Sequence, residues 1–447
     1  MKNILLIEPG YKNKYPPLGL MKIAAYHRIK GDNVIFYKGL SSELKAKTWD
    51  RVYVATLFTF YWKQTVQTIK YYKRSVVSDD GFFVGGVMAT LMKDDLEKEA
   101  DVRIIPGLLD KPGMLGEDKH IVDNMIPDYS ILKQIDYIYP TSDAYIGYAT
   151  RGCVNRCKFC AVHKIEPNFQ GYLPLKKQIE GIKKIYGEKK DLLLLDNNVL
   201  ASNRFEEIIS DIIDLGFEKG SKFGNKLRYV DFNQGVDVRL LNKKRMELLS
   251  KIAIKPLRIA YDHVSLTKQY KEKVRLAADF GIKHLSNFIL YNYTDSPLDL
   301  YRRLKVNIQL NKELGTKIYS FPMKYIPLNA KDRTYIGPKW SKKSIRAIQS
   351  ILLATHGMVT PNKKFFEAAF GCNQEEFKRL LILPEKYIIN RVKHSSNGAL
   401  DWGKEINKAT KGMMRELRAL IASNKVLPED FSRTKNPKVR SLLEHYL

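Results

Sequence analysis

Short apolar runs alternate with amphipathic stretches over the first 330 residues of the chain. In the N-terminal part each apolar run is bounded by glycine, proline or polar residues, as buried strands are. The stretch "GLMKIAAYHRIK" between the first two runs has the period of a helix. Strands that alternate with helices predict a doubly wound, Rossmann-like parallel sheet. Its expected strands lie in residues 3–9, 33–39, 51–60, 81–91 and 101–107.

A second series of the same kind begins at Ala144, after a passage rich in proline and glycine at 111–143. Six strand patterns alternate with helical patterns here, which predicts an incomplete (β/α)6 barrel. In such barrels the chemistry lies at the C-terminal ends of the strands. The expected strands are 144–150, 191–197, 227–234, 256–262, 284–291 and 317–323, and the helices between them are 174–186, 203–215, 241–252, 266–280 and 297–314.

From about residue 338 the pattern becomes helical, basic and interleaved with aromatic residues. The chain is therefore expected to contain an N-terminal domain, a linker, a barrel and a C-terminal helical region. These predicted parts are 1–110, 111–143, 144–337 and 338–447.

Net charge adds a candidate class of partner. The chain carries 76 Lys and Arg against 48 Asp and Glu, a formal net charge of +28. So basic a chain favours an anionic partner such as nucleic acid, although a merely solvated lysine surface would give the same count. The C-terminal region also has two interpretations. Its lysines and aromatic residues either bind a polyanion, or the aromatic residues form the core of a helical cap and the lysines are merely solvated. The residues concerned are Trp340, Lys363, Lys364, Phe365, Phe366 and Phe370.

The termini and cysteines point to the cytoplasm. The opening "MKNILLIEPG" lacks the apolar run of a secretory signal, and no stretch approaches the roughly 18 apolar residues of a spanning helix. Four cysteines are too few for a disulfide framework at this size. We therefore expect a cytoplasmic protein with reduced thiols.

Three of those cysteines fall within "TRGCVNRCKFCAVHK", residues 150–164, directly after the first barrel strand. Three thiolates on one loop could hold zinc with His163 as the fourth ligand, although zinc sites usually join two separated segments. They could instead hold an iron–sulfur cluster with one iron left open. The remaining cysteine, Cys372, lies far along the chain and is expected to be a buried apolar residue.

The Cys153-x3-Cys157-x2-Cys160 spacing, with Phe159 before the last cysteine and "TRGC" ending the strand, resembles the radical S-adenosylmethionine (SAM) superfamily. The segments "PPLGLMKIAAYHRIKGDNV", "GGVMATL" and "IPDYSIL" resemble members of that superfamily with an N-terminal cobalamin-binding-type domain. The resemblance covers about residues 1–330.

The resemblance implies an enzyme in which Cys153, Cys157 and Cys160 bind a [4Fe-4S] cluster. The open iron would bind SAM, and an electron donor such as flavodoxin or ferredoxin would supply the electron that cleaves it. The resulting radical would abstract hydrogen or support methyl transfer. His263 is either a proton donor or a surface or core histidine. The residues that the resemblance places near SAM are Phe159, Asp196, Asn197, Asn198, Gln234, Asp237 and Asp262.

Cobalamin and substrate stay open in the sequence. The loop "EPGYKNKYPPLG" lacks the histidine that many cobalamin domains supply, so a degenerate domain is the alternative. Too few cysteines remain for a second cysteine-bound cluster. Nucleic acid, a peptide and a small metabolite are all candidate substrates. The alternative to an enzyme is a nucleic-acid-binding protein whose cysteine loop holds a structural metal.

Overall fold

The computed structural model describes residues 1–389 and 398–447. The chain is mixed α/β with parallel sheets, as predicted. It divides into two compact units, one formed by 1–257 with 326–335 and the other by 258–325 with 336–447. Each unit is described by itself.

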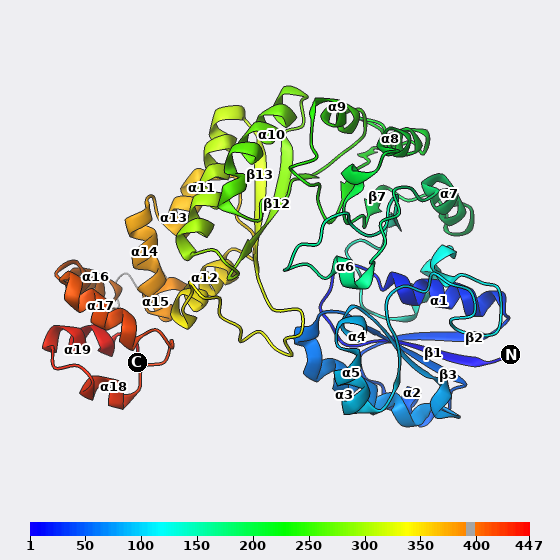
Figure 1. Cartoon of the computed structure of the whole chain (residues 1–447), viewed down its shortest axis with the longest axis horizontal. Coiled ribbons are helices and arrows are strands. Elements are labelled where there is room, and N and C mark those ends of the chain that lie inside the picture. The colour runs from blue at the N-terminus through cyan, green and yellow to red at the C-terminus, as the bar shows by residue number, and fades with distance from the viewer. Residues whose placement is uncertain (390–397) are drawn as a thin grey trace. The chain divides into compact units, whose positions relative to one another are not determined.

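The first unit begins with a five-stranded parallel sheet in the order β2-β1-β3-β4-β5. Residues 4–7, in the inner strand β1, are fully buried, because helices cover both faces of the sheet (Figure 1). α1 lies on one face, and α3 and α5 on the other (Figure 1). The strands are β1 (Asn3–Glu8), β2 (Asn33–Lys38), β3 (Arg51–Thr56), β4 (Phe82–Gly86) and β5 (Arg103–Ile105). The helices are α1 (Leu18–Ile29), α2 (Ser42–Ala46), α3 (Trp62–Tyr72), α4 (Val87–Leu91) and α5 (Lys93–Ala100).

The predicted strand 81–91 is correct only in its first half, because its second half forms the helix α4. β4 ends at Gly86, where the backbone takes a positive φ of 100° and the chain turns into α4. A Cβ at Gly86 would lie 2.3 Å from the carbonyl oxygen of Thr56 on β3, so only glycine fits. The glycine therefore allows two neighbouring strands to approach each other closely.

The first unit also contains a three-stranded parallel sheet in the order β10-β7-β6. The longer helices of this part of the unit bury one face each. In α8 the buried residues include Phe205, Ile208, Ile209 and Ile212, which recur at intervals of three or four residues and therefore lie on one face of the helix. The elements are β6 (Ala144–Gly147), β7 (Asp191–Leu194), β10 (Val230–Phe232), α6 (Val162–Ile165), α7 (Leu175–Tyr186), α8 (Phe205–Asp214), α9 (Lys243–Lys251) and the hairpin of β8 (Lys222–Phe223) with β9 (Lys226–Leu227).

Residues 326–335 belong to the first unit although the second unit flanks them in sequence. The ammonium of Lys331 lies 4.2 Å from the ring centroid of Trp62 and 3.0 Å from a carboxylate oxygen of Asp95. The guanidinium of Arg333 lies 4.2 Å from the ring centroid of Phe60. These contacts attach the segment, which we call the return segment, to the N-terminal sheet.

The second unit holds the sheet β11-β12-β13, in which β12 and β13 are parallel. Ser296 and Asp299 form a capping box at the start of α11, and Gly315 ends the helix in the left-handed conformation. The elements are β11 (Leu257–Arg258, at the boundary of the units), α10 (Thr267–Asp279), β12 (His284–Tyr291), α11 (Pro297–Leu314) and β13 (Lys317–Lys324).

The C-terminal region is helical, as predicted. Trp340, Phe366 and Phe370 are at most 8% exposed and belong to one apolar core with α11 and α12, whereas Phe365 is 40% exposed. Most of these aromatic side chains therefore form the core of a helical cap. None of the described helices is long and apolar enough to cross a membrane. The helices are α12 (Lys342–Ala354), α13 (Lys363–Phe370), α14 (Gln374–Ile382), α15 (Glu385–Ile389), α16 (Ala399–Asn407), α17 (Lys411–Leu420), α18 (Pro428–Ser432) and α19 (Pro437–Glu444).

Candidate functional site

The three clustered cysteines lie on the loop that leaves the C-terminal end of β6. Each is partly exposed, and the backbone N–H of Cys160 donates to the carbonyl of Cys157 at 3.0 Å. Gly152, with φ +71°, precedes them; a Cβ there would lie 2.5 Å from the carbonyl oxygen of Asn168. The sequence thus needs glycine at this position to bring the loop close to the segment after α6.

A buried carboxylate, Glu166, fixes the start of this loop. Its Oε2 accepts hydrogen bonds from the Gly152 backbone N–H at 2.7 Å and from Asn197 Nδ2 at 2.9 Å. Its Oε1 accepts from Arg151 Nη1 at 2.7 Å. One side chain therefore joins the cysteine loop to the turn after β7.

Arg151 extends this network toward the N-terminal sheet. Its Nη2 donates to both carboxylate oxygens of Asp123, at 2.6 and 2.8 Å, and its guanidinium lies 3.8 Å from the ring centroid of Tyr148. Lys22 on α1 forms a second ion pair with Asp123 at 2.9 Å. Burial alone would raise the pKa of Asp123, but the two cations outweigh it and lower the pKa to about 2. The carboxylate is therefore ionised throughout the physiological range.

The far side of the loop is held from the turn after β10. Asp237 Oδ2 accepts from Asn155 Nδ2 at 2.9 Å and from Arg239 Nη2 at 2.7 Å. Burial opposes ionisation of Asp237, but the hydrogen bonds from Arg239 dominate and lower its pKa. Arg239 also hydrogen-bonds to Cys157, so a cation lies beside one thiol, where it would stabilise a thiolate.

The polar triplet after β7 has three different environments. Asp196 is fully buried and accepts from the backbone N–H groups of Ala149 and Thr150, and from Thr150 Oγ1 at 2.6 Å. Burial raises the pKa of Asp196 to about 6. Asn197 bonds Glu166, and Asn198 donates to Cys153 Sγ at 3.4 Å. Asp196 therefore holds the start of the loop, and only Asn198 of the three has a hydrogen bond to a cysteine.

Two amide groups have features that suit ligand binding. The buried Oδ1 of Asn198 has no hydrogen-bond partner among the described residues, and a buried acceptor without a donor is costly. Gln234 is exposed after β10, and its Nε2 donates to Asn233 Oδ1 at 3.2 Å. Phe159 is partly buried within the loop itself.

Asp262 lies in the second unit and is partly exposed, and its backbone carbonyl accepts from Arg303 Nη1 at 2.7 Å. Arg303 is fully buried and forms an ion pair with Asp295 at 2.7 Å. His263 is exposed, and its Nδ1 accepts from the backbone N–H of Ser265, capping the short turn Val264–Leu266. These contacts favour a surface, turn-forming histidine.

Sequence reasoning missed Glu166, Asp123, Arg303 and Lys22, because buried charges leave no periodic signal. Arg151 lies inside the quoted motif and could have been singled out as a buried cation. The prediction for Cys372 was wrong: it is exposed, because it follows α13 at Gly371, where the chain turns with φ +88°.

No protein-family model and no curated protein matches the chain.

The donor set of the loop suits an iron–sulfur cluster. Cys153, Cys157 and Cys160 are partly exposed, and Glu166 and Asp237 hold the loop that carries them from two sides. Thiolates are the ligands that such clusters use, and each would bind a different iron.

Cobalamin does not fit the N-terminal sheet. Glu8, at the C-terminal end of β1, is buried, and its carboxylate accepts hydrogen bonds from Asn13 of the following loop, Lys38 at the end of β2 and Tyr139 of the linker. Tyr11 is 2% exposed, and its ring stacks on Tyr61 with centroids 4.9 Å apart. Ligands of such sheets bind at this switch point between β1 and β3, which here is filled by the chain itself.

Proposed function

We propose that the protein is a radical SAM enzyme whose Cys153, Cys157 and Cys160 hold a [4Fe-4S] cluster. The observation that carries the proposal is the cysteine loop at the C-terminal end of β6, with three partly exposed thiols and polar turns after β7 and β10 beside it. When bound, the cluster would supply the electron that breaks a carbon–sulfur bond of SAM.

The proposal includes a partial (β/α)6 barrel. In its support, each unit contributes a three-stranded sheet with parallel strands, β10-β7-β6 in one and β11-β12-β13 in the other. The chain order of these strands and their intervening helices is that of successive β/α units. In such barrels the active site lies at the C-terminal ends of the strands, which is where the cysteine loop follows β6.

The chain's own residues have distinct roles in this proposal. Glu166 and Asp237 orient the loop from its two sides, and Arg239 stabilises the negative charge of Cys157. Asn198 and Gln234 are the amides available to bind the polar groups of SAM, whereas Asp196 holds the backbone directly after β6. Asp262 belongs to the second unit, and its role near SAM stays a prediction from the sequence resemblance.

We propose hydrogen abstraction as the reaction type. Methyl transfer through cobalamin would need a corrin at the N-terminal sheet, and the residues there do not fit one. The substrate classes stay those of the sequence: nucleic acid, a peptide or a small metabolite, with flavodoxin or ferredoxin as electron donor.

The test begins with anaerobic reconstitution. We expect brown protein with about four iron per chain, and 5′-deoxyadenosine released from SAM under reduction. Cys153→Ala, Cys157→Ala and Cys160→Ala should each lose the cluster, because each removes a ligand. Cys372→Ala is the matched control and should keep it.

One observation favours the alternative of a structural zinc loop: the Nδ1 of His163 is buried without a hydrogen-bond partner among the described residues. If it completes a zinc site, the purified protein is colourless, holds one zinc per chain and loses it in His163→Ala. That result would replace the enzyme proposal with a nucleic-acid-binding protein that has a structural metal.

A further inference from the structure

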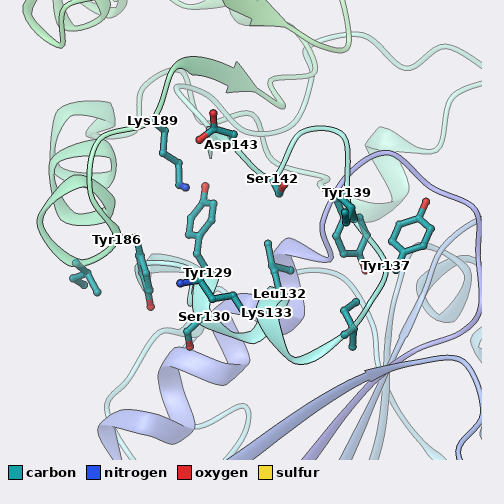
Figure 2. A pocket seen from close by; sticks show the side chains of 13 residues that line it. Tyr129, Ser130, Leu132, Lys133, Tyr137, Tyr139, Ser142, Asp143, Tyr186 and Lys189 are labelled. Atoms are coloured by element: carbon teal, nitrogen blue, oxygen red, sulfur yellow. The ribbon is translucent and has the colours of Figure 1, made fainter. Parts of the chain in front are cut away.

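A cavity of about 510 Å³ lies at the N-terminal ends of β6 and β7 (Figure 2). Its lining comes from residues 129–143, which precede β6, and from residues 185–189, which precede β7. The cysteine loop lies at the opposite, C-terminal ends of the same strands. The cavity, which we call the basal pocket, is therefore separate from the site described above.

Tyrosine rings form much of the wall of the basal pocket (Figure 2). Each hydroxyl donates to the scaffold, so the rings are fixed in place and lose little entropy when a ligand binds. Tyr137 and Tyr186 are partly exposed and present apolar surface, whereas Tyr129 and Tyr139 are at most 6% exposed. The four bonds are Tyr129 to the Ala144 carbonyl, Tyr186 to Asp128, Tyr137 to the Asn13 carbonyl and Tyr139 to Glu8.

Two isoleucines at the pocket leave large apolar side chains in water. Ile138 is 83% exposed and Ile185 is 60% exposed, one from each of the two lining segments. Exposed apolar side chains that gather at a cavity mark a surface that a ligand covers. A flat, largely apolar group would bury both of them against the tyrosine rings.

Two lysines supply positive charge to the same pocket. The ammonium of Lys189 lies 4.7 Å from the ring centroid of Tyr129, and Lys133 lines the pocket from the other segment (Figure 2). Neither forms an ion pair with a described residue. Burial lowers the pKa of Lys189; Asp143 opposes this effect and Lys133 adds to it. Two amines against one carboxylate, Asp143, leave the pocket net positive.

We propose that the basal pocket binds a nucleotide unit, with the base against the partly exposed rings of Tyr137 and Tyr186 and the isoleucines, and the phosphate at Lys133 and Lys189. A cavity of this volume is in the range of small-ligand pockets. Fixed aromatic surface beside lysines is the combination that binds single-stranded nucleic acid, and a free mononucleotide has the same chemistry. The inference goes beyond the proposed function and does not depend on a cluster.

The test measures binding by the full-length protein to fluorescein-labelled single-stranded RNA, with AMP as the competitor. We expect the double variant Lys133→Gln/Lys189→Gln to weaken RNA binding about tenfold and to reduce the salt slope by about 0.7 for each phosphate that the variant no longer neutralises. Ile138→Asp, at an exposed position that folding does not need, should weaken binding as well. Competition by AMP assigns the pocket to free nucleotides; RNA binding that AMP does not displace assigns it to a strand.

The matched control is Lys177→Gln/Lys184→Gln, two exposed lysines of α7 outside the pocket. An equal loss in this control shows that diffuse charge binds the RNA, and overturns the proposal. Binding of neither RNA nor AMP, or binding that the pocket variants leave unchanged, overturns it too. All of these measurements can be made on iron-free protein, so their outcome is independent of whether the enzyme proposal holds.

Discussion

Asp196 is a buried carboxylate that receives hydrogen bonds from Ala149 and Thr150 and forms no ion pair with a described residue. Water would stabilise its charge better than these donors do, which is why burial raises its pKa to about 6 from 3.8. The folded protein therefore binds a proton at Asp196 more tightly than the unfolded chain does.

This difference predicts a pH dependence of stability. The contribution of Asp196 is fully present below about pH 4 and is lost as the pH rises through about 6, by up to roughly 3 kcal/mol. Asp196→Asn should remove this part of the pH dependence. Urea unfolding of both proteins at several pH values between about 4 and 7 measures it, with the exposed Asp214→Asn as control. Parallel curves for the wild type and Asp196→Asn would contradict the assignment.

The same residue shows what sequence reasoning could not resolve. The sequence predicts Asp196, Asn197 and Asn198 together as ligand-facing residues, because they follow a strand at the edge where barrels bind ligands. In an irregular turn, neighbouring side chains have no fixed period, so nothing in the sequence indicates that Asp196 is buried against Thr150, that Asn197 bonds Glu166 and that Asn198 bonds Cys153. The strand end was predictable, but the directions of its side chains were not.

At the scale of elements, the network of Glu166, Arg151 and Asp123 connects the cysteine loop to the linker and, through Lys22, to α1. Buried ion pairs of this kind are costly when one partner is removed. Because Glu166 accepts from the residue next to Cys153, its charge and its hydrogen bonds both affect the loop.

We therefore predict that Glu166→Gln raises the reduction potential of the proposed cluster by an amount on the order of 50 mV, because a negative charge is removed nearby. Redox titration monitored by electron paramagnetic resonance measures the potential. The control is Glu207→Gln on α8, which breaks an exposed ion pair with Arg204. This variant should leave the reduction potential unchanged. A full complement of iron with an unshifted potential in Glu166→Gln would show that Glu166 acts on the fold alone.

The elements themselves were largely predictable. Residues 297–314 are predicted as a helix and form α11, and 284–291 form β12, because both have strong periods and clear end signals. The expected strand 256–262 is reduced to Leu257–Arg258, since its later residues turn toward backbone contacts with Arg303. Apolar content alone does not reveal where strand pairing stops.

At the scale of the whole molecule, we predict that the protein does not bind cobalamin. Its own side chains occupy the edge of the N-terminal sheet where the ligand would bind. Protein incubated with hydroxocobalamin and desalted should show no corrin absorbance, because Glu8, Tyr11 and their partners occupy the switch point. A known cobalamin-binding protein treated in parallel is the control. Retention of a stoichiometric corrin would refute this assignment and restore methyl transfer as the reaction type.

The return segment affects the order in which the protein can fold during its synthesis. The first unit includes residues 326–335, so a ribosome must translate 258–325 of the second unit before the first can be finished. Until then the rings of Phe60 and Trp62 lack their contacts with Arg333 and Lys331. Domains usually fold one after another as they emerge, at about 5–20 residues per second. Here the first unit is completed only after residues 326–335 have been made, and a fragment cut at residue 257 would omit a piece of that unit.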